Sequence, residues 1–277
     1  MAIKLVAIDI DGTLINDQRE ITPQTVAAIK KASAQGVKIV LCTGRPMTGV
    51  KAYLDQLGLN DSDNEFVISF NGALAQSTSG NVLVNYTMPF NDYADWQTYC
   101  IKEGVKSQIE TRDYIYTINR DLSPYTVYES DLVSMPIRYR TFEELSKMQD
   151  QYVIAKAMMV DTKEQIDKAW AELSAEMRDR FSIVRSEDFY LEFMNKQASK
   201  GNALQLLSEE LGIKKEEVMA LGNAQNDDSM IEFAGLGVAM GNSIPGTLKI
   251  ADVTTADNNH DGVGKAIEKY VLKYRQK

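Results

Sequence analysis

Two aspartates near the N-terminus, Asp9 and Asp11, are spaced so that their carboxylates could serve one site. They lie two residues apart at the end of the apolar run 3–8, so both side chains can point into one pocket. Carboxylates that close repel each other unless a cation neutralises them or one binds a proton. Oxygen ligands suit Mg²⁺, which typically uses one or two carboxylates together with a substrate phosphate. A carboxylate held beside Mg²⁺ can attack phosphorus, while the second moves protons.

The alternative interpretation is that Asp9 is a turn residue or a helix cap. The Gly12-Thr13-Leu14 sequence that follows, and the apolar run before it, favour the chemical interpretation.

The elements that must position these aspartates follow an alternating pattern. The run 3–8 is almost continuously apolar, as is typical of a strand buried on both faces of a parallel sheet. Thr22-Pro23 is typical of a helix cap followed by proline in the first turn. The α/β alternation predicts a doubly wound, mostly parallel, Rossmann-like sheet. The predicted strands are 3–8, 37–41, 66–70, 218–221 and 237–240, and the predicted helices are 23–35, 46–57, 200–211 and 227–233.

The middle of the chain lacks the α/β alternation of the flanking segments, and this difference predicts a second domain. A hairpin is expected over 74–86, and short helices and alternating strands follow it. We therefore expect a discontinuous catalytic core of residues 1–86 and 191–277, with an α+β cap inserted at residues 87–190. Within the cap the predicted helices are 91–103 and 162–178, and the predicted strands are 114–118, 153–160 and 181–186.

Polar clusters follow the predicted core strands, and ligands of open α/β sheets bind at the carboxyl ends of the strands. Lys200, at the start of a predicted helix, can approach the same edge. Polar groups from distant parts of the chain are thus expected to converge there. The clusters are Asp9 with Asp11, Thr43-Gly44-Arg45, Asn71-Gly72, and the segment 222–227.

These segments, in this order, resemble the four motifs of the haloacid dehalogenase-like hydrolases. Asp-Ile-Asp-Gly-Thr-Leu at 9–14 is similar to the first motif, and Thr43, Lys200 and the segment 222–227 match the second, third and fourth. The insertion resembles the cap of the Cof-type subgroup, which is similar to sugar-phosphate phosphatases. Asn71-Gly72-Ala73 and Asp261-Gly262-Val263 are also familiar from that subgroup.

The resemblance implies a role for each matching residue. Asp9 would be the nucleophile and Asp11 the acid and base, with Thr43 on the transferred phosphoryl group. The Lys200 ammonium would offset the charge of the aspartate and the phosphate. Mg²⁺ would be held by the Asp9 carboxylate, the Asp11 carbonyl and the fourth motif. The expected metal ligands of that motif are Asn223 and Asp227, and the expected substrate-binding residues are Thr43, Gly44, Arg45, Asn71 and Asn226.

Asn223 departs from the family pattern, whose fourth motif usually reads Gly-Asp-x-x-Asn-Asp. An amide oxygen can still bind Mg²⁺, but the site loses one negative charge. Three outcomes stay open: weaker metal binding with retained activity, compensation by Asp227, or a degenerate protein that binds phosphates without turnover.

Several of these residues have ordinary structural interpretations as well. Thr43 alone would be a helix cap and Lys200 a surface lysine, and their order relative to Asp9 favours function. Arg45 could bind the substrate or pair with a surface acid, and Asn71 could cap a turn. His260 is expected to be a solvated loop residue and Cys42 a small residue at a strand end. Tyr114, Tyr116 and Tyr125 of the cap are candidates for specificity or for core packing.

Composition narrows the function classes further. The 277 residues carry a net charge of −9 and two cysteines, which argues against a nucleic-acid surface and a disulfide framework. No apolar stretch is long enough for a membrane span, so a cytoplasmic protein is expected. The pattern favours an Mg²⁺-dependent phosphatase of small phosphorylated metabolites. A phosphomutase and a regulator that binds sugar phosphates are the alternatives, and neither the substrate nor the oligomeric state is indicated by the sequence.

Overall fold

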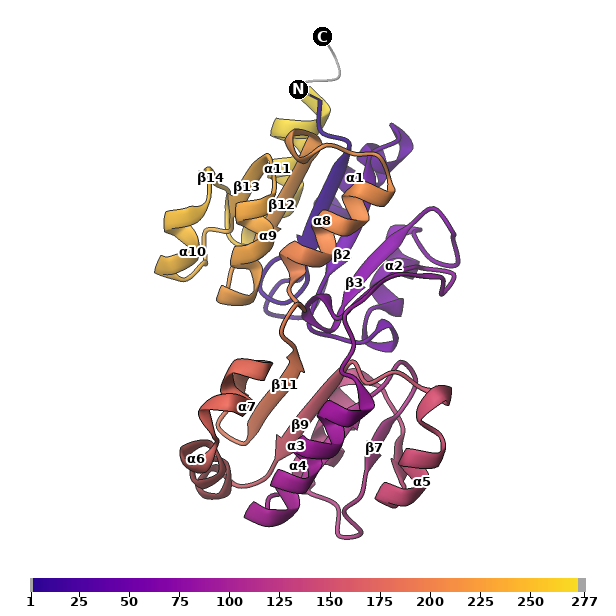
Figure 1. The fold of residues 1–277 in the computed structure, drawn as a ribbon. Coiled ribbons are helices and arrows are strands. Elements are labelled where there is room, and N and C mark those ends of the chain that lie inside the picture. The colour runs from indigo at the N-terminus through magenta and orange to yellow at the C-terminus, as the bar shows by residue number, and fades with distance from the viewer. Residues whose placement is uncertain (1, 274–277) are drawn as a thin grey trace. The chain divides into compact units, whose positions relative to one another are not determined.

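The computed structural model describes residues 2–273 and divides the chain into two compact units (Figure 1). The first unit contains residues 2–44, 50–85 and 199–273 of this range, and the second contains 45–49 and 86–198. Over the described residues the first unit forms an eight-stranded sheet in the order β14-β13-β12-β1-β2-β3-β4-β5. Its strands are β1 (Leu5–Asp9), β2 (Lys38–Cys42), β3 (Phe66–Ser69), β4 (Leu74–Ser77), β5 (Val82–Asn85), β12 (Val218–Gly222), β13 (Leu236–Ala239) and β14 (Val253–Thr254).

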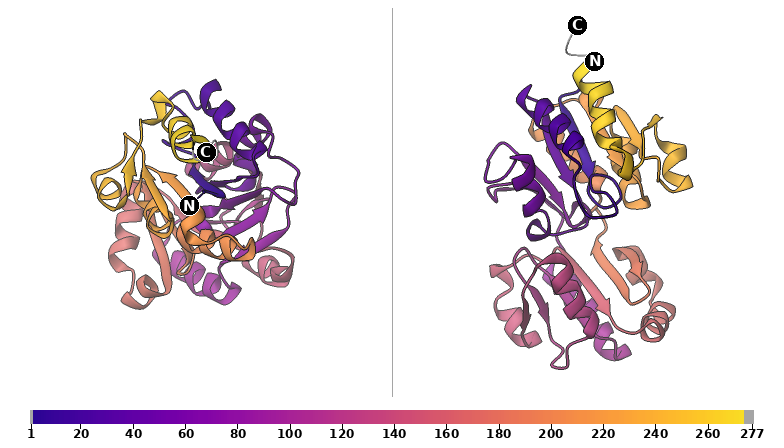
Figure 2. Two further views of the ribbon diagram at one scale, coloured as in Figure 1. Left: turned by 90° about the horizontal axis from the view of Figure 1, so that it is seen from above. Right: turned by 180° about the vertical axis from the view of Figure 1, so that it is seen from behind.

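The core sheet is parallel from β14 to β3, and β4 and β5 extend it antiparallel. Helices cover both faces: α1 packs with α11 on one face and α8 with α9 on the other (Figure 2). The predicted doubly wound α/β fold is confirmed. Its helices are α1 (Pro23–Ala34), α2 (Lys51–Leu57), α8 (Lys200–Glu210), α9 (Asp228–Phe233), α10 (Pro245–Ile250) and α11 (Gly262–Ile267).

Strand β1 lies in the middle of this sheet and is buried along its whole length. Leu5 pairs with Val218 of β12 on one side and with Lys38 of β2 on the other. Apolar side chains on both faces explain why the run lacks alternation, since a parallel strand between two helical layers meets no water. The carboxyl end of β1 is therefore held rigidly at the centre of the sheet.

The second unit is a mixed sheet in the order β10-β11-β9-β6-β7-β8. Its neighbouring strands are antiparallel except for β7 and β8, which are parallel. A mixed sheet with helices is the α+β structure expected for the cap. Its elements are α3 (Phe90–Glu103), β6 (Ser107–Glu110), β7 (Ile115–Thr117), α4 (Pro124–Val133), β8 (Ile137–Tyr139), α5 (Phe142–Lys147), β9 (Lys156–Val160), α6 (Lys163–Glu172), α7 (Ala175–Arg180), β10 (Phe181–Glu187) and β11 (Tyr190–Asn195).

The largest differences from the predicted boundaries lie at three places. The helix expected over 162–178 is two helices, because the chain leaves the helix at Leu173 and Ser174 caps α7. The helix expected over 46–57 begins as a short 3-10 turn, with α2 itself starting at Lys51. The cap boundary expected at residue 190 cuts into β11, which pairs with β9 and β10, so residues 191–198 group with the second unit.

Helix α4 was not predicted, although Ser123-Pro124 repeats the cap-and-proline pattern of Thr22-Pro23. Its packing explains why it also lacks an apolar pattern. Its buried positions include Thr126 and Glu129, while Val127, Tyr128 and Leu132 on the same helix are exposed. The apolar period of 3.6 residues by which a helix is detected is therefore absent. The segment is helical because Ser123 caps it and Pro124 starts it.

The two faces of the cap sheet are chemically different. One face, with α3, α5 and α6, forms an apolar core around Trp96 and Phe193. The other face, with Glu129 of α4, buries the ammonium of Lys156 among three carboxylates. The Nζ atom lies 3.4 Å from Glu110, 3.7 Å from Glu129 and 3.3 Å from Glu192.

Three carboxylates around one lysine leave the cluster with an excess of negative charge. Burial raises the pKa of Glu110 to about 8; Lys156 opposes this shift, while Glu129 and Glu192 add to it. One proton shared in this cluster at neutral pH therefore relieves the repulsion.

Replacing Glu110 by glutamine should remove the loss of stability that ionisation of Glu110 causes at higher pH. The folded pKa of Glu110 lies above its unfolded value of 4.5, so its ionisation lowers stability progressively as pH rises from about 5 to 8. We expect Glu110→Gln to gain about 1–3 kcal/mol over the wild type between these pH values. Urea unfolding at pH 5 and pH 8 measures this difference. The exposed Glu143→Gln is the control, and a pH-independent effect of Glu110→Gln would contradict the protonated state.

None of the helices within residues 2–273 has the length and apolar character required to span a bilayer.

Candidate active site

Asp9 is the last residue of β1, and the next residues turn sharply around it. Leu14 donates its backbone N–H to the Asp9 carbonyl at 3.1 Å, and Gly12 has a φ of +75° that suits glycine. Asp9 is buried, whereas Asp11 is exposed. The nucleophile candidate is thus fixed by the sheet, and the acid/base candidate lies where a leaving group can reach it.

Lys200 links this turn to the fourth motif. Its ammonium lies 2.7 Å from Asp9 Oδ1 and 2.6 Å from Asp227 Oδ1, and its side chain is 0% exposed. Ser199 caps α8 by accepting from the Asn202 N–H, which places Lys200 in the first helical turn. The predicted convergence of the third motif with Asp9 is therefore present as two buried ion pairs.

Both carboxylate oxygens of Asp227 are already engaged. Oδ1 accepts from Lys200, and Oδ2 accepts from the backbone N–H groups of Asn223 and Ala224 at 2.9 and 3.0 Å. These contacts favour a role in positioning Lys200 and the loop over the predicted role of direct metal ligand, which stays a prediction. Gly222 is required beside it, because a Cβ there would lie 2.4 Å from Asp227 Cβ.

Burial and neighbouring charges shift the pKa values of Asp9 and Lys200. Burial raises the pKa of Asp9 to about 7, Asp227 and Asp11 add to this, and Lys200 opposes it. The pKa of Lys200 is raised despite burial, because Asp227 and Asp9 favour its charged form. A further positive charge near Asp9 would favour its ionised, nucleophilic state.

The second motif and the Asn71 turn lie side by side. Thr43 is buried, and its carbonyl accepts from the Asn71 N–H at 2.9 Å. The Asn71 side chain lies next to Gly44 and accepts from Asn226 Nδ2 at 3.2 Å. Asn71 has a φ of +52°, a conformation that asparagine tolerates better than most residues. The predicted substrate-binding residues of the first unit are thus brought together by backbone and amide contacts.

Arg45 groups differently from these residues. It belongs with residues 46–49 to the second unit, and its guanidinium donates to the Gly49 carbonyl at 3.4 Å. Its predicted contact with substrate stays a prediction.

Gly72 joins the Asn71 turn to the start of α8. It has a φ of +96°, and a Cβ there would lie 2.1 Å from the Ser199 carbonyl oxygen. Only glycine permits this approach, so the Asn71-Gly72 turn helps to place Lys200.

The oxygens expected to hold Mg²⁺ converge around the Asn223 amide. One of its two outer atoms lies 3.0 Å from the Asp11 carbonyl oxygen and 3.3 Å from Asp9 Oδ2. Neighbouring ligands of an octahedral Mg²⁺ are about 3.0 Å apart, so this spacing fits the ion. Within residues 2–273 no three His, Cys, Asp or Glu side chains are arranged to hold a metal. The protein groups whose spacing fits the ion are the Asp9 carboxylate, the Asp11 carbonyl and the Asn223 amide.

Comparisons with known proteins agree with this geometry. The profile of the haloacid dehalogenase-like hydrolases matches residues 6–267. The chain belongs to this family.

Its relatives are similar to it over nearly the full length of both chains. A protein of Streptococcus pyogenes serotype M6, whose name marks it as a candidate phosphatase, is 45% identical over 98% of this chain and all of its own length. A 5-amino-6-(5-phospho-D-ribitylamino)uracil phosphatase of Bacillus subtilis is 30% identical over 98% of this chain and 96% of its own. A haloacid dehalogenase-like hydrolase of Bacteroides thetaiotaomicron has a similar crystal structure, with a TM-score of 0.85 and 31% identity over 96% of this chain and 99% of its own. The protein is a phosphatase of small phosphorylated metabolites.

The structure adds residues to the phosphatase site that had no assigned role. The Thr13 hydroxyl lies 3.0 Å from the Asn223 amide, and Asn242 Nδ2 donates to the Gly12 carbonyl at 2.9 Å. Ser229 accepts from the Gly201 N–H at 3.0 Å. Asn242 follows the carboxyl end of β13. The other clusters were identified because they follow the carboxyl ends of strands, and the same reasoning could have identified Asn242.

The remaining chemical candidates of the first unit have structural roles. Burial raises the pKa of the Cys42 thiol to about 12, so it stays protonated and unreactive. The His260 side chain is 72% exposed and pairs with Asp257 in its own loop. A cysteine nucleophile is therefore unsupported.

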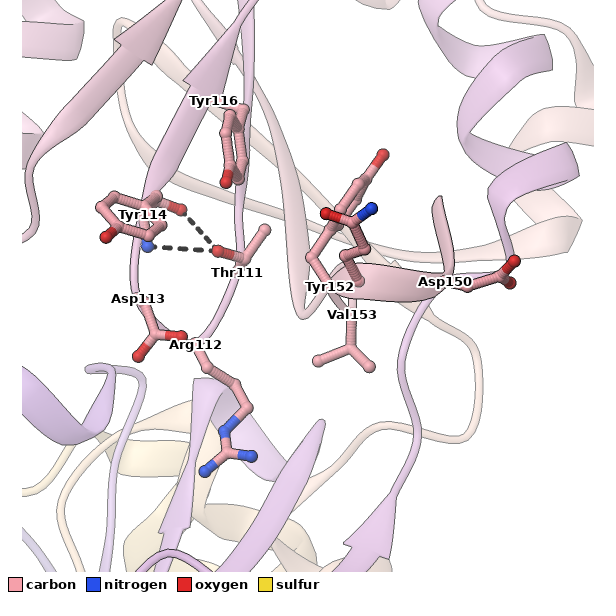
Figure 3. Close-up of a pocket in the computed structure, with 9 residues that line it drawn as sticks. Thr111, Arg112, Asp113, Tyr114, Tyr116, Asp150, Tyr152 and Val153 are labelled. Atoms are coloured by element: carbon pink, nitrogen blue, oxygen red, sulfur yellow. Dashed lines mark hydrogen bonds between the residues drawn. The ribbon is translucent and has the colours of Figure 1, made fainter. Parts of the chain in front are cut away.

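The cap contains a pocket of about 290 Å³ (Figure 3). Tyr116 is 5.8 Å from Tyr114 and 5.6 Å from Tyr152 between ring centroids, and Arg138 lies 3.6 Å from the centre of the Tyr114 ring. Tyr125 instead stacks on Phe189. Tyrosines beside charged and amide side chains suit a ligand that carries several hydroxyl groups. The pocket is lined by Thr111, Arg112, Asp113, Tyr114, Tyr116, Asp150, Gln151, Tyr152 and Val153.

Removal of the Lys200 charge should destabilise the protein strongly. Lys200→Met leaves Asp9 and Asp227 buried without their counter-charge, so we expect the free energy of unfolding to fall by about 3–5 kcal/mol. Urea unfolding followed by circular dichroism measures this loss. The exposed Lys249→Met is the matched control, and a loss below about 1 kcal/mol in Lys200→Met would contradict the buried ion pairs.

Proposed function

We propose that this phosphatase hydrolyses phosphomonoesters of sugar-like metabolites through an aspartyl-phosphate on Asp9, with Mg²⁺ as cofactor. The observation that carries the proposal is the buried Lys200 ammonium on Asp9 Oδ1, with Asp9 Oδ2 directed toward Asn223. The two oxygens of the nucleophile thus have different partners and can have different tasks. Members of this family are generally Mg²⁺-dependent.

In the first step, Asp9 Oδ1 attacks the phosphorus atom. The new bond joins Oδ1 to phosphorus, and the bond between phosphorus and the ester oxygen breaks. Lys200 beside Oδ1 stabilises the charge of the transferring group, and the buried Thr43 offers its hydroxyl to a phosphoryl oxygen. Asp11, which is exposed at the turn, donates its proton to the leaving oxygen so that an alcohol departs.

In the second step, water replaces the leaving alcohol. Asp11, now ionised, removes one proton from the water as its oxygen attacks phosphorus. The phosphorus–Oδ1 bond breaks, inorganic phosphate leaves and Asp9 is regenerated. When bound by Asp9 Oδ2, the Asp11 carbonyl and Asn223, Mg²⁺ would supply positive charge that draws the phosphate to Asp9 and reduces their mutual repulsion.

The sugar-like substrate class is supported by the cap and by the relatives. The cap pocket is lined by Arg112, Asp113 and Gln151 together with tyrosines, and these polar groups suit the hydroxyls of a polyol. A subclass IIB sugar phosphatase of this superfamily has a TM-score of 0.75 and 26% identity over 96% of this chain and 98% of its own. The 5-amino-6-(5-phospho-D-ribitylamino)uracil phosphatase is named for a substrate that carries a phosphorylated ribityl chain.

Removal of the nucleophile should abolish turnover. We expect Asp9→Asn to lose at least about 10³-fold in kcat, because the amide is a poor nucleophile. Asp11→Asn should lose about 10²–10⁴-fold through absent proton transfer. Phosphate release from p-nitrophenyl phosphate with Mg²⁺ measures both, with the exposed Asp131→Asn as control. Full activity in a folded Asp9→Asn protein would refute the mechanism.

The same assay separates the alternatives. A phosphomutase would return an isomerised sugar phosphate with little free phosphate, and a regulator would bind phosphate esters without turnover under any divalent metal.

The cap pocket should affect selectivity more than chemistry. We expect Tyr114→Ala to lower kcat/KM by about tenfold or more for the best sugar phosphate of a metabolite screen, because the loss of one ring contact is of this size. The value for p-nitrophenyl phosphate should stay within about threefold. Tyr128→Ala, which removes an exposed cap ring, is the control. Equal losses for both substrates would contradict a role in substrate selection.

A further inference from the structure

Asn223 lies in the loop after β12, with its side chain against the turn that contains both aspartates. One outer atom of its amide faces three oxygens: the Asp11 carbonyl at 3.0 Å, Asp9 Oδ2 at 3.3 Å and Thr13 Oγ1 at 3.0 Å. A Cβ on Gly12 would lie 2.6 Å from the Asn223 side chain, so Gly12 leaves the space that the amide needs. The amide is therefore held within the group of oxygens expected to bind Mg²⁺.

The two orientations of the amide fit two different states of this site. With nitrogen inward, the NH₂ group donates to the Asp11 carbonyl and to Asp9 Oδ2. With oxygen inward, it accepts from the Thr13 hydroxyl at 3.0 Å and stands beside two other oxygens. Oxygens that close are favourable when a cation lies among them and unfavourable otherwise. The Thr13 hydroxyl adapts to both orientations, since a hydroxyl can accept or donate.

We propose that Asn223 is a positioning residue that turns its amide over between the metal-free and the Mg²⁺-bound site. The inference rests on the Mg²⁺ site of the proposed function. Without the ion, the NH₂ group bridges Asp9 Oδ2 and the Asp11 carbonyl and takes the place of the missing positive charge. With the ion, the amide oxygen becomes a ligand.

An aspartate at this position cannot perform the first of these tasks. A carboxylate has no N–H to donate, and it would add a negative charge beside Asp9 and Asp227, which share the buried ammonium of Lys200. The metal-free site would be destabilised, and Mg²⁺ would bind more tightly because it relieves more repulsion. Asn223 thus exchanges metal affinity for stability of the metal-free protein.

Thermal unfolding and calorimetry of Asn223→Asp test this exchange. In EDTA we expect the Tm of Asn223→Asp to be lower than that of the wild type by about 4 °C or more. Titration with Mg²⁺ alone should give a Kd at least about tenfold tighter, and saturating Mg²⁺ should raise the Tm of the variant more than that of the wild type. Asn64→Asp, the same change at an exposed loop position of the first unit, should show neither effect.

The amide itself can be observed by NMR. The side-chain ¹H–¹⁵N pair of Asn223 is identified by its absence from Asn223→Asp. In EDTA we expect the NH₂ protons to exchange slowly with solvent, because they are hydrogen-bonded to the Asp11 carbonyl and Asp9 Oδ2. On addition of Mg²⁺ we expect the signal to shift and the protons to exchange faster. The spectrum is independent of turnover and is therefore interpretable in an inactive Asp9→Asn background as well as in the wild type.

Three results would overturn the proposal. They are an equal Tm of wild type and Asn223→Asp in EDTA, an unchanged Mg²⁺ affinity, or an Asn223 amide signal that saturating Mg²⁺ does not move. Failure of the proposed function is distinguishable, since it appears as absent phosphate release from a protein whose Mg²⁺ affinity, Tm and amide signal follow these expectations.

Discussion

The buried ammonium of Lys200 is the interaction on which the rest of the site depends. It is bonded to one oxygen of Asp9 and one of Asp227, and so it joins the end of β1 to the loop after β12 through the start of α8. A buried ion pair of this kind is expensive to desolvate and stabilises the fold little by itself, whereas loss of one partner is costly. Its value is geometric: three segments from distant parts of the chain are held where a phosphoryl group can be attacked.

The glycines around this contact are a consequence of it. Gly72 admits the Ser199 carbonyl, and Gly201 admits the Ser229 carbonyl, whose oxygen a Cβ would approach to 2.1 and 2.3 Å respectively. Helix α8 can therefore approach the sheet closely enough for a lysine in its first turn to reach Asp9. Asp227 in turn accepts two backbone N–H groups of its own loop, so the loop geometry and the lysine position are fixed together.

The two units solve the problem of buried charge in different ways. In the first unit two carboxylates share Lys200, and Asn223 adds a neutral amide where a third acid would increase repulsion. In the cap three carboxylates surround Lys156, and the balance requires a proton on the cluster, as the raised pKa of Glu110 indicates.

The sequence by itself determined the fold class and the polar clusters at the strand ends, and its resemblance to a known family implied the roles of Asp9, Asp11, Thr43 and Lys200. It did so because apolar periodicity and strand-end polarity are local properties of the chain. Strands β6, β8 and β11 and helix α4 were not predicted. In α4 the buried residues include Thr126 and Glu129, whose burial depends on tertiary contacts that no local apolar pattern records. The partners of Asp227, the convergence around Asn223 and the grouping of Arg45 with the second unit were likewise decided by the tertiary structure. These depend on which atoms meet across distant segments, and spacing along the chain does not specify the direction in which a side chain points.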